Sequence, residues 1–258
     1  MNENVFNIEI NESERIDRVN ENITLIQKKD GLTFGTDAYL LAAYMYNNSS
    51  GVAVELGGGT GIISLLLSTK RRFSKIFVNE IQSEFCDIIS RNIHLNNTEN
   101  VFVLSGDARN LEPQVIGSEA DVVFSNPPYM KVNSGKQNKN EAKYIARHEV
   151  FGNINDFCES AYRLLKYGGK FYVVYRPDRL SELISALTKN KLEPKKMTFV
   201  QADAESVPSM VLIEAKKGAS PSLTLTRPLI LYKDKNKNMS TDAEKIYEIC
   251  SFEEFFKK

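Results

Sequence analysis

The chain has 258 residues, and its 33 lysines and arginines balance its 33 aspartates and glutamates. This length suits one well-buried α/β domain and is short for two. A net charge of zero excludes a globally basic surface, so any surface that binds nucleic acid must be local. The polar, acidic start predicts no signal peptide, and the longest apolar stretch, residues 38–46, is too short to span a bilayer. We therefore expect a cytoplasmic protein without a membrane segment.

The first fifty residues predict a β-hairpin followed by a short helix. Two strand-like runs, 15–19 and 23–27, are separated by a polar turn. An apolar helical run, 38–44, then follows Thr36 and Asp37, which are residue types that cap the start of a helix. For Asp37 an ordinary helix cap and a turn that faces a ligand both remain open.

A strand, a glycine-rich turn and a helix follow at residues 52–67. Glycines allow close backbone approach, and the first helical N–H groups offer donors to a ligand. A dinucleotide-binding fingerprint would need a further glycine where the chain has Ile62. The spacing instead resembles the first motif of S-adenosylmethionine-dependent methyltransferases, although such a turn can also be purely structural. The residues that carry this likeness are Glu55, Gly57, Gly59 and Gly61.

The next two predicted strands each end in an acidic residue. Glu80 closes the strand 75–80, about twenty positions beyond the loop, where nucleotide-binding sheets place a carboxylate on the ribose hydroxyls. A charge that stabilises the start of the following helix is the alternative for Glu80. Asp107 and Ala108 follow the strand 101–104, where methyltransferases of this fold contact the adenine amine of the cofactor. Ordinary turn chemistry is the alternative for Asp107.

The fourth strand, residues 121–125, ends at the most informative feature of the sequence, Asn126-Pro127-Pro128-Tyr129. The two prolines stop the strand and fix a rigid turn. The side-chain carbonyl of Asn126 and the backbone carbonyl of Pro127 can accept both N–H bonds of a planar amino group, against which Tyr129 can stack. This pattern predicts a site that holds an amine for methylation. For Pro-Pro-Tyr alone, a structural turn with a buried tyrosine would be the better interpretation.

A basic segment, residues 131–147, follows this turn, and Glu141 is its single acid. Its Asn, Gly, Ser and Gln content predicts a loop, and we expect that loop to contact phosphates on either side of a flipped base. A solvated loop with scattered charge is the alternative. The cations are Lys131, Lys136, Lys139, Lys143 and Arg147, and His148 comes next.

Helices and strands alternate beyond this loop, and two closing strands, near 195–201 and 208–215, have no helix between them. The order predicts an α/β fold. The resemblance to S-adenosylmethionine-dependent methyltransferases implies that this fold is the Rossmann-like class I methyltransferase fold. Its seven-stranded, mostly parallel sheet would have an antiparallel hairpin at the far edge and helices on both faces. We expect a single methyltransferase domain over 1–258, made of an N-terminal hairpin and helix (1–50), a cofactor-binding and catalytic core (51–217) and a C-terminal extension (218–258).

Three segments together resemble the bacterial tRNA1(Val) (adenine(37)-N6)-methyltransferase family, over about residues 13–232. They are Phe34-Gly35-Thr36-Asp37-Ala38, Asn126-Pro127-Pro128-Tyr129 and Ile145-Ala146-Arg147-His148-Glu149. Asn-Pro-Pro-Tyr alone is also found in adenine-N6 DNA methyltransferases and in enzymes that methylate a glutamine of release factors. Such families usually have Asp at the position of Glu55, and Gly58 is an extra glycine that could loosen the turn.

The resemblance implies S-adenosylmethionine as cofactor and the anticodon loop of a tRNA as partner, with adenosine 37 of a valine tRNA as the methylated base. It places Thr36 and Asp37 near the methionine end of the cofactor, and Asn126 against both cofactor and substrate. Arg147 and His148 would lie nearer the base than the lysines. We expect a monomer that needs no metal.

Two other functions remain open. A protein-glutamine N5-methyltransferase could use the same turn, although the sequence lacks a separate N-terminal helical domain. A non-catalytic module that keeps the fold as a scaffold is disfavoured by the intact Asn126 and Tyr129.

Overall fold

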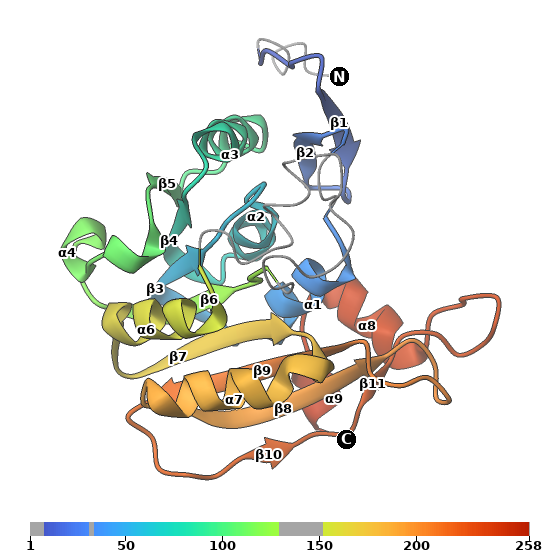
Figure 1. Cartoon of the computed structure of the whole chain (residues 1–258). Coiled ribbons are helices and arrows are strands. Elements are labelled where there is room, and N and C mark those ends of the chain that lie inside the picture. Colours follow the sequence, from blue (N-terminus) through green and yellow to red (C-terminus); the bar gives the residue numbers. More distant parts are fainter. Residues whose placement is uncertain (1–7, 31–33, 129–151, 258) are drawn as a thin grey trace.

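The computed structural model describes residues 8–30, 34–128 and 152–257 (Figure 1). The strands are β1 (Glu14–Arg18), β2 (Thr24–Lys28), β3 (Asn48–Leu56), β4 (Phe73–Glu80), β5 (Val101–Ser105), β6 (Ala120–Ser125), β7 (Leu165–Tyr175), β8 (Leu192–Gln201), β9 (Met210–Lys217), β10 (Thr224–Leu225) and β11 (Leu229–Ile230). The helices are α1 (Thr36–Tyr44), α2 (Ile62–Thr69), α3 (Ser83–Leu95), α4 (Pro113–Ile116), α6 (Ile154–Leu164), α7 (Leu180–Lys189), α8 (Thr241–Ile249) and α9 (Glu253–Phe256), with single 3-10 turns η1 (Ala108–Asn110) and η2 (Pro177–Arg179).

In the described part of the chain, nine strands form one sheet in the order β10-β8-β9-β7-β6-β3-β4-β5, and β11 also pairs with β8. Only β9 runs antiparallel to its neighbours β7 and β8. The predicted mostly parallel sheet with a closing antiparallel hairpin is therefore confirmed. The hairpin is not the outermost element, because β9 lies between β7 and β8, and the two-residue strands β10 and β11 extend the sheet beyond β8.

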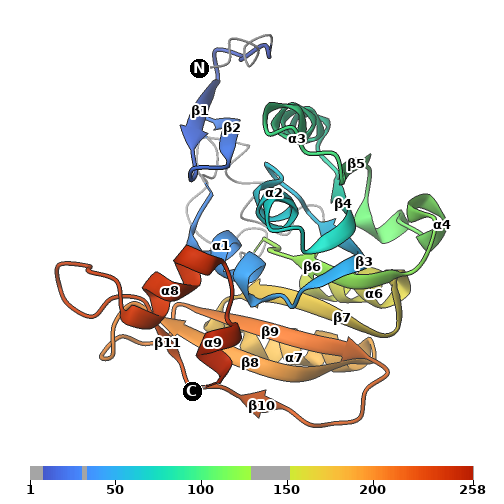
Figure 2. The ribbon, with the colours of Figure 1, turned by 180° about the vertical axis from the view of Figure 1, so that it is seen from behind.

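Two hydrophobic cores lie on opposite faces of the sheet, because successive side chains of a strand point to opposite sides. Ala53 and Val122 enter the core beneath α1, α2 and α8. Their neighbours Val54 and Val123 enter the core beneath α4, α6 and α7. Figures 1 and 2 show these two helix layers from opposite sides. Among the described residues, every helix is too short or too polar to cross a lipid bilayer.

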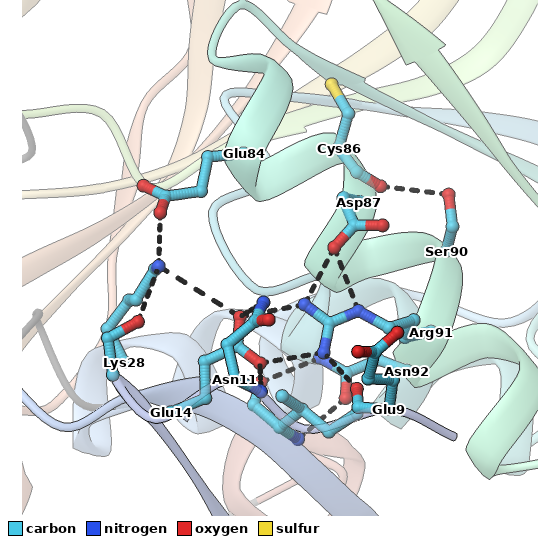
Figure 3. Close-up of polar contacts among 12 residues, drawn as sticks. Glu9, Asn11, Glu14, Lys28, Glu84, Cys86, Asp87, Ser90, Arg91 and Asn92 are labelled. Carbon is cyan, nitrogen blue, oxygen red and sulfur yellow. Dashed lines mark hydrogen bonds and ion pairs between the residues drawn. The ribbon is translucent and has the colours of Figure 1, made fainter. Parts of the chain in front are cut away.

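The N-terminal hairpin is confirmed, with β1 and β2 antiparallel from Glu14 opposite Lys28 to Arg18 opposite Thr24. A buried ion pair attaches it to α3 (Figure 3). Both terminal nitrogens of Arg91 donate to the fully buried carboxylate of Glu14, at 2.7 and 2.8 Å. This paired geometry makes the hydrogen bonds strong, and the Arg91 guanidinium lowers the pKa of Glu14 to about 2.

Asn92 of α3 and Asn96, which directly follows that helix, pair with the backbone of β2 through their side-chain amides. The side-chain amide of Asn92 accepts from Ile26 N at 2.7 Å and donates to Ile26 O at 3.0 Å. Asn96 makes the same pair of bonds with Thr24, at 2.9 and 2.7 Å. Backbone groups that would otherwise be unpaired are thereby satisfied, so the hairpin is fixed to the helix in a defined register.

The C-terminal helices hold α1 in place (Figure 2). The ring of Tyr39 stacks on that of Tyr247 at 4.6 Å between centroids, and its hydroxyl donates to the Tyr247 carbonyl at 2.6 Å. The buried guanidinium of Arg72 donates to the carbonyls of Met45 and Cys250, and thereby joins the end of α1 to the end of α8. The position of α1 therefore depends on residues about two hundred positions further along the chain.

We expect Glu14→Gln to lower the free energy of unfolding at neutral pH by about 1–3 kcal/mol, because the charged Arg91 loses its buried partner. The pKa of Glu14 is about 2 in the folded protein against an ordinary 4.5. Its contribution is therefore complete above pH 4.5 and is lost as the pH falls towards 2. Urea-unfolding curves should show the difference between wild type and variant closing over that range.

Asp87→Asn is the matched control for this prediction, because Asp87 pairs with the same Arg91 but its side chain is 62% exposed. Loss of an exposed pair should change stability by less than about 1 kcal/mol. A difference between wild type and Glu14→Gln that stays constant at every pH would contradict the role assigned to the buried pair.

Candidate active site

The predicted site residues follow the carboxyl ends of four neighbouring parallel strands. The glycine-rich turn follows β3, Glu80 ends β4, Asp107 follows β5 and Asn126 follows β6. In the sheet these strands lie side by side in the order β6-β3-β4-β5. Because parallel strands end at the same edge, the four groups meet along one rim, which is where open α/β sheets bind ligands.

The glycine-rich turn closes tightly on the end of β4. The N–H groups of Gly57 and Gly58 both donate to the carbonyl of Asn79, at 2.9 and 3.0 Å. A Cβ atom at Gly58 would stand 2.2 Å from Val78 Cγ1. The expectation that Gly58 loosens the turn was therefore wrong, since the missing side chain is what lets the turn approach β4.

Gly59 stands at the outer point of the turn, with φ +56°, a conformation that strains other residues. Among the described residues, a Cβ at this position would meet no atom within 4 Å. Its N–H donates to the carboxylate of Glu80 at 2.9 Å, and the other oxygen of Glu80 accepts from Gln82 N at 2.9 Å. Glu80 thus joins the turn to the residue preceding α3, and its burial raises its pKa.

Glu55 lies beneath this turn and is 1% exposed. Its carboxylate accepts a hydrogen bond from the hydroxyl of the buried Ser64, which lies in the first turn of α2. Burial raises the pKa of Glu55 to about 8. Sequence reasoning missed Ser64, although a single hydroxyl inside the apolar run 62–67 was a visible signal.

The turn after β5 is held by one side-chain amide of β4. Asn79 Nδ2 donates to the carbonyls of Leu104 and Gly106, at 3.2 and 2.9 Å. Asp107 caps the short turn that begins at Ala108 and pairs with the side chain of Arg109, which lowers the pKa of Asp107. Asn79 was also missed, because the sequence drew attention only to its neighbour Glu80.

Asn126 is half-buried at the end of β6, and Pro127 after it is buried. Its Nδ2 donates to Asp37 Oδ2 at 3.0 Å, while Asp37 Oδ1 accepts from Ala38 N at 2.9 Å. The structure therefore brings together two segments that the sequence places 89 positions apart. Immediately before Asn126, the buried Ser125 hydroxyl donates to Leu56 O at 2.7 Å and ties β6 to the start of the glycine-rich turn.

The predicted capping of α1 by Thr36 or Asp37 was wrong. The N-cap residue is Gly35, and both predicted caps lie inside the first turn of the helix. Asp37 instead directs one carboxylate oxygen to the turn after β6. The remaining predicted contacts lie outside the described residues and stay predictions: Tyr129, Lys131, Lys136, Lys139, Lys143, Arg147 and His148.

A model of the family described as the methyltransferase small domain matches residues 28–190. Two similar curated proteins are both named tRNA1(Val) (adenine(37)-N6)-methyltransferase. The protein from Phocaeicola vulgatus is 28% identical over 75% of this chain and 80% of its own length. That from Trichodesmium erythraeum is 24% identical over 67% of this chain and 75% of its own length.

Solved structures agree on the fold. A predicted O-methyltransferase from Agrobacterium tumefaciens superposes with a TM-score of 0.69 and 19% identity, over 84% of this chain and 97% of that one. TYW2 of M. jannaschii, solved in complex with AdoMet, has a TM-score of 0.55 and 15% identity, over 81% and 88% of the two chains. The predicted class I methyltransferase fold is confirmed. Since the family model covers more than half of the sequence, the chain belongs to the methyltransferase small domain family and is an S-adenosylmethionine-dependent methyltransferase.

Proposed function

We propose that this enzyme methylates N6 of an adenine in tRNA, and that its target is adenosine 37 of a valine tRNA. The observation that carries the proposal is the position of Asn126, at the rim beside the glycine-rich turn with its amide hydrogen-bonded to Asp37. The names of the curated relatives support the same reaction and the same base. A cytoplasmic monomer is the form in which we expect it to act.

The residues at the rim fit S-adenosylmethionine. No described residue lies against the outer side of Gly59, which leaves its backbone open to a ligand, and Glu80 bonds to its N–H. Glu80 would hold the ribose, Asp107 and Ala108 the adenine, and Thr36 the methionine end. Asp37, which the family resemblance also places at the methionine end, has its carboxylate hydrogen-bonded to Asn126. Glu55 is buried behind the turn and would support the cofactor site by holding the first turn of α2 through Ser64. When bound, the cofactor supplies an electrophilic methyl carbon on a positively charged sulfur, which is a good leaving group.

Asn126 and Pro127 would activate the amine by holding it. The N6 lone pair of adenine is conjugated with the ring and is a poor nucleophile. Two carbonyl acceptors aimed at its N–H bonds draw the nitrogen towards tetrahedral geometry and raise its electron density. These bonds strengthen towards the transition state, as catalysis requires. Fixing the amine in line with the methyl carbon supplies a further part of the acceleration. No strong base is needed, because the methylated cation loses its proton readily.

An adenine beside the anticodon already lies in a loop, so its extrusion into the site costs only a few kcal/mol. Tyr129 would stack on the flipped base, and the lysines of 131–147 would contact the flanking phosphates. Arg147 and His148 would lie closer to the base. A glutamine side chain of a protein also presents a planar NH2 group, but a peptide substrate lacks the phosphates of tRNA, so the salt dependence of binding separates the two substrates.

Glu80→Ala should weaken S-adenosylmethionine binding by about 1–3 kcal/mol in isothermal titration calorimetry, because the ligand hydroxyls lose a buried acceptor. Glu84→Ala is the control, since Glu84 lies four residues on, in the first turn of α3, with its side chain 61% exposed. Unchanged affinity in a folded Glu80→Ala protein would contradict its assignment to the cofactor.

Asn126→Ala should reduce turnover of tRNA about a hundredfold or more, while the affinity for S-adenosylmethionine changes much less. The physical reason is that the main partner of Asn126 is the reacting amine. Single-turnover transfer of a labelled methyl group measures the first quantity and calorimetry the second. Asn100→Ala, which removes an amide that donates to Phe73 O at the amino end of β4, is the control. Turnover near the wild-type rate would show that another group holds the amine.

Replacing Lys136, Lys139 and Lys143 together by Ala should weaken tRNA binding and flatten its dependence on salt. Each lost phosphate contact reduces the slope of log K against log salt by about one. Cofactor binding should stay unchanged. A control triple variant at Lys70, Lys75 and Lys189 removes exposed charge from the opposite edge of the sheet, at or near the amino ends of β4 and β8.

Normal tRNA methylation by the Lys136/Lys139/Lys143 variant at physiological salt would contradict phosphate binding by these lysines. Residues 131–147 would then be a solvated connection with no role in substrate binding. Methyl transfer to a release-factor glutamine peptide, with little salt dependence, would replace the tRNA proposal by the protein-glutamine one. Mapping the modified nucleoside in total tRNA from a strain lacking the gene identifies the base directly.

A further inference from the structure

The carboxylate of Asp37 bonds to Ala38 and to Asn126 at the start of α1. One oxygen accepts from Ala38 N at 2.9 Å, which fixes the carboxylate to its own helix. The other accepts from Asn126 Nδ2 at 3.0 Å. Both residues are half-buried, so solvent screens this contact less than it would an exposed one.

This contact determines which end of the Asn126 amide faces which way. The two ends of an amide are nearly equal in size, but one only donates and the other only accepts. An ionised carboxylate only accepts, so the NH2 end must face Asp37. The carbonyl oxygen is then turned away from Asp37. A flipped amide would present its NH2 group where the proposed reaction needs an acceptor for the substrate N–H.

We propose that Asp37 is a positioning residue that orients the Asn126 amide so that its carbonyl oxygen receives the substrate amine. This inference rests on the proposed role of Asn126 and deepens it. It gives Asp37 a function in methyl transfer that does not require contact with the cofactor.

Orientation is accompanied by an electronic effect. A hydrogen bond from an amide N–H to a charged carboxylate is stronger than one between neutral groups. It polarises the amide and increases the negative charge on the carbonyl oxygen, as expected in a cooperative chain of hydrogen bonds. That oxygen then stabilises more effectively the positive charge that develops on the amine during methyl transfer.

The helix that carries Asp37 is fixed independently of the rim. Tyr39, two residues on, is stacked on Tyr247 and bonded to its carbonyl. The N–H of Phe252 donates to the carbonyl of Ala43 at 3.2 Å, close to the end of α1. Because these contacts fix both halves of α1, the carboxylate of Asp37 is held in a defined position next to Asn126.

A double-mutant cycle tests whether Asp37 acts through Asn126. Asp37→Ala should reduce single-turnover methyl transfer to tRNA by about 10- to 100-fold, the effect expected when a reacting pair is misaligned. The affinity for S-adenosylmethionine should stay within about twofold. In an Asn126→Ala background, Asp37→Ala should cause no further loss, because the amide that it orients is gone. Asp37→Asn should resemble Asp37→Ala, since an amide partner accepts either orientation.

Tyr44→Phe is the matched control on the same helix. It removes a buried hydroxyl that bonds to Thr198 in β8, leaves Asp37 and the contacts of Tyr39 in place, and its methyl-transfer rate should stay near that of the wild type. Additive loss of turnover in the double variant, or a loss of cofactor affinity that accounts for the effect of Asp37→Ala, would overturn the proposal and assign Asp37 to the cofactor.

A second measurement needs no substrate. The side-chain NH2 resonance of Asn126 in a 1H–15N spectrum should be displaced downfield in the wild type, and should return towards the free-amide position in Asp37→Ala. An unmoved resonance would overturn the proposal. If the wild type shows no transfer to tRNA, the proposed function fails, while this spectrum still decides whether Asp37 orients the amide.

Discussion

Closure of the glycine-rich turn against the end of β4 is the contact on which the rest of the site depends. Each of residues 78–80 contacts the turn. Val78 fills the space beside Gly58, the Asn79 carbonyl accepts two N–H groups of the turn, and the Glu80 carboxylate accepts a third. The side chain of Asn79 also bonds to the turn after β5. Three consecutive residues thereby set the relative positions of three strand ends, and no side chain larger than hydrogen would fit at position 58.

This closure places two buried carboxylates close to one another. Glu55 lies beneath the turn and Glu80 at its side, and each has a pKa raised mainly by burial. Repulsion from Glu80 adds to the effect at Glu55. Burying acidic groups together destabilises a protein unless they bind donors or a cation. Hydrogen bonds from Ser64, Gly59 and Gln82 offset part of that cost, and the positively charged cofactor of this enzyme class would offset more.

The sequence predicted the parts of the site that follow strand ends, because strand periodicity and turn residues mark those positions clearly. Glu80, Asp107 and Asn126 could therefore be assigned to one rim from the order of residues alone. That order could not reveal the structural roles of Asn79, Ser64 or Asn92, since the role of a buried polar residue becomes clear only when its hydrogen-bond partner is known.

The predicted capping of α1 was wrong for a related reason. Asp37 is a residue type suited to an N-cap, but its competing partner, Asn126, is distant in sequence and adjacent only after the sheet has formed.

Helix α1 is where the two terminal segments and the rim of the sheet meet. The hairpin leads into it, and Gln27 Oε1 accepts from Phe34 N at 3.3 Å just before the helix begins. The hairpin is also linked to the glycine-rich turn, because Asn92 donates to Thr60 O at 3.0 Å as well as pairing with β2. On the other side, Arg72 and Tyr247 bind the C-terminal segment to the same helix. These links support treating the hairpin, the sheet and the C-terminal segment as one methyltransferase domain. Both terminal segments contact α1 or the glycine-rich turn. A change in either segment would therefore shift α1 and, with it, the position of Asp37 at the rim.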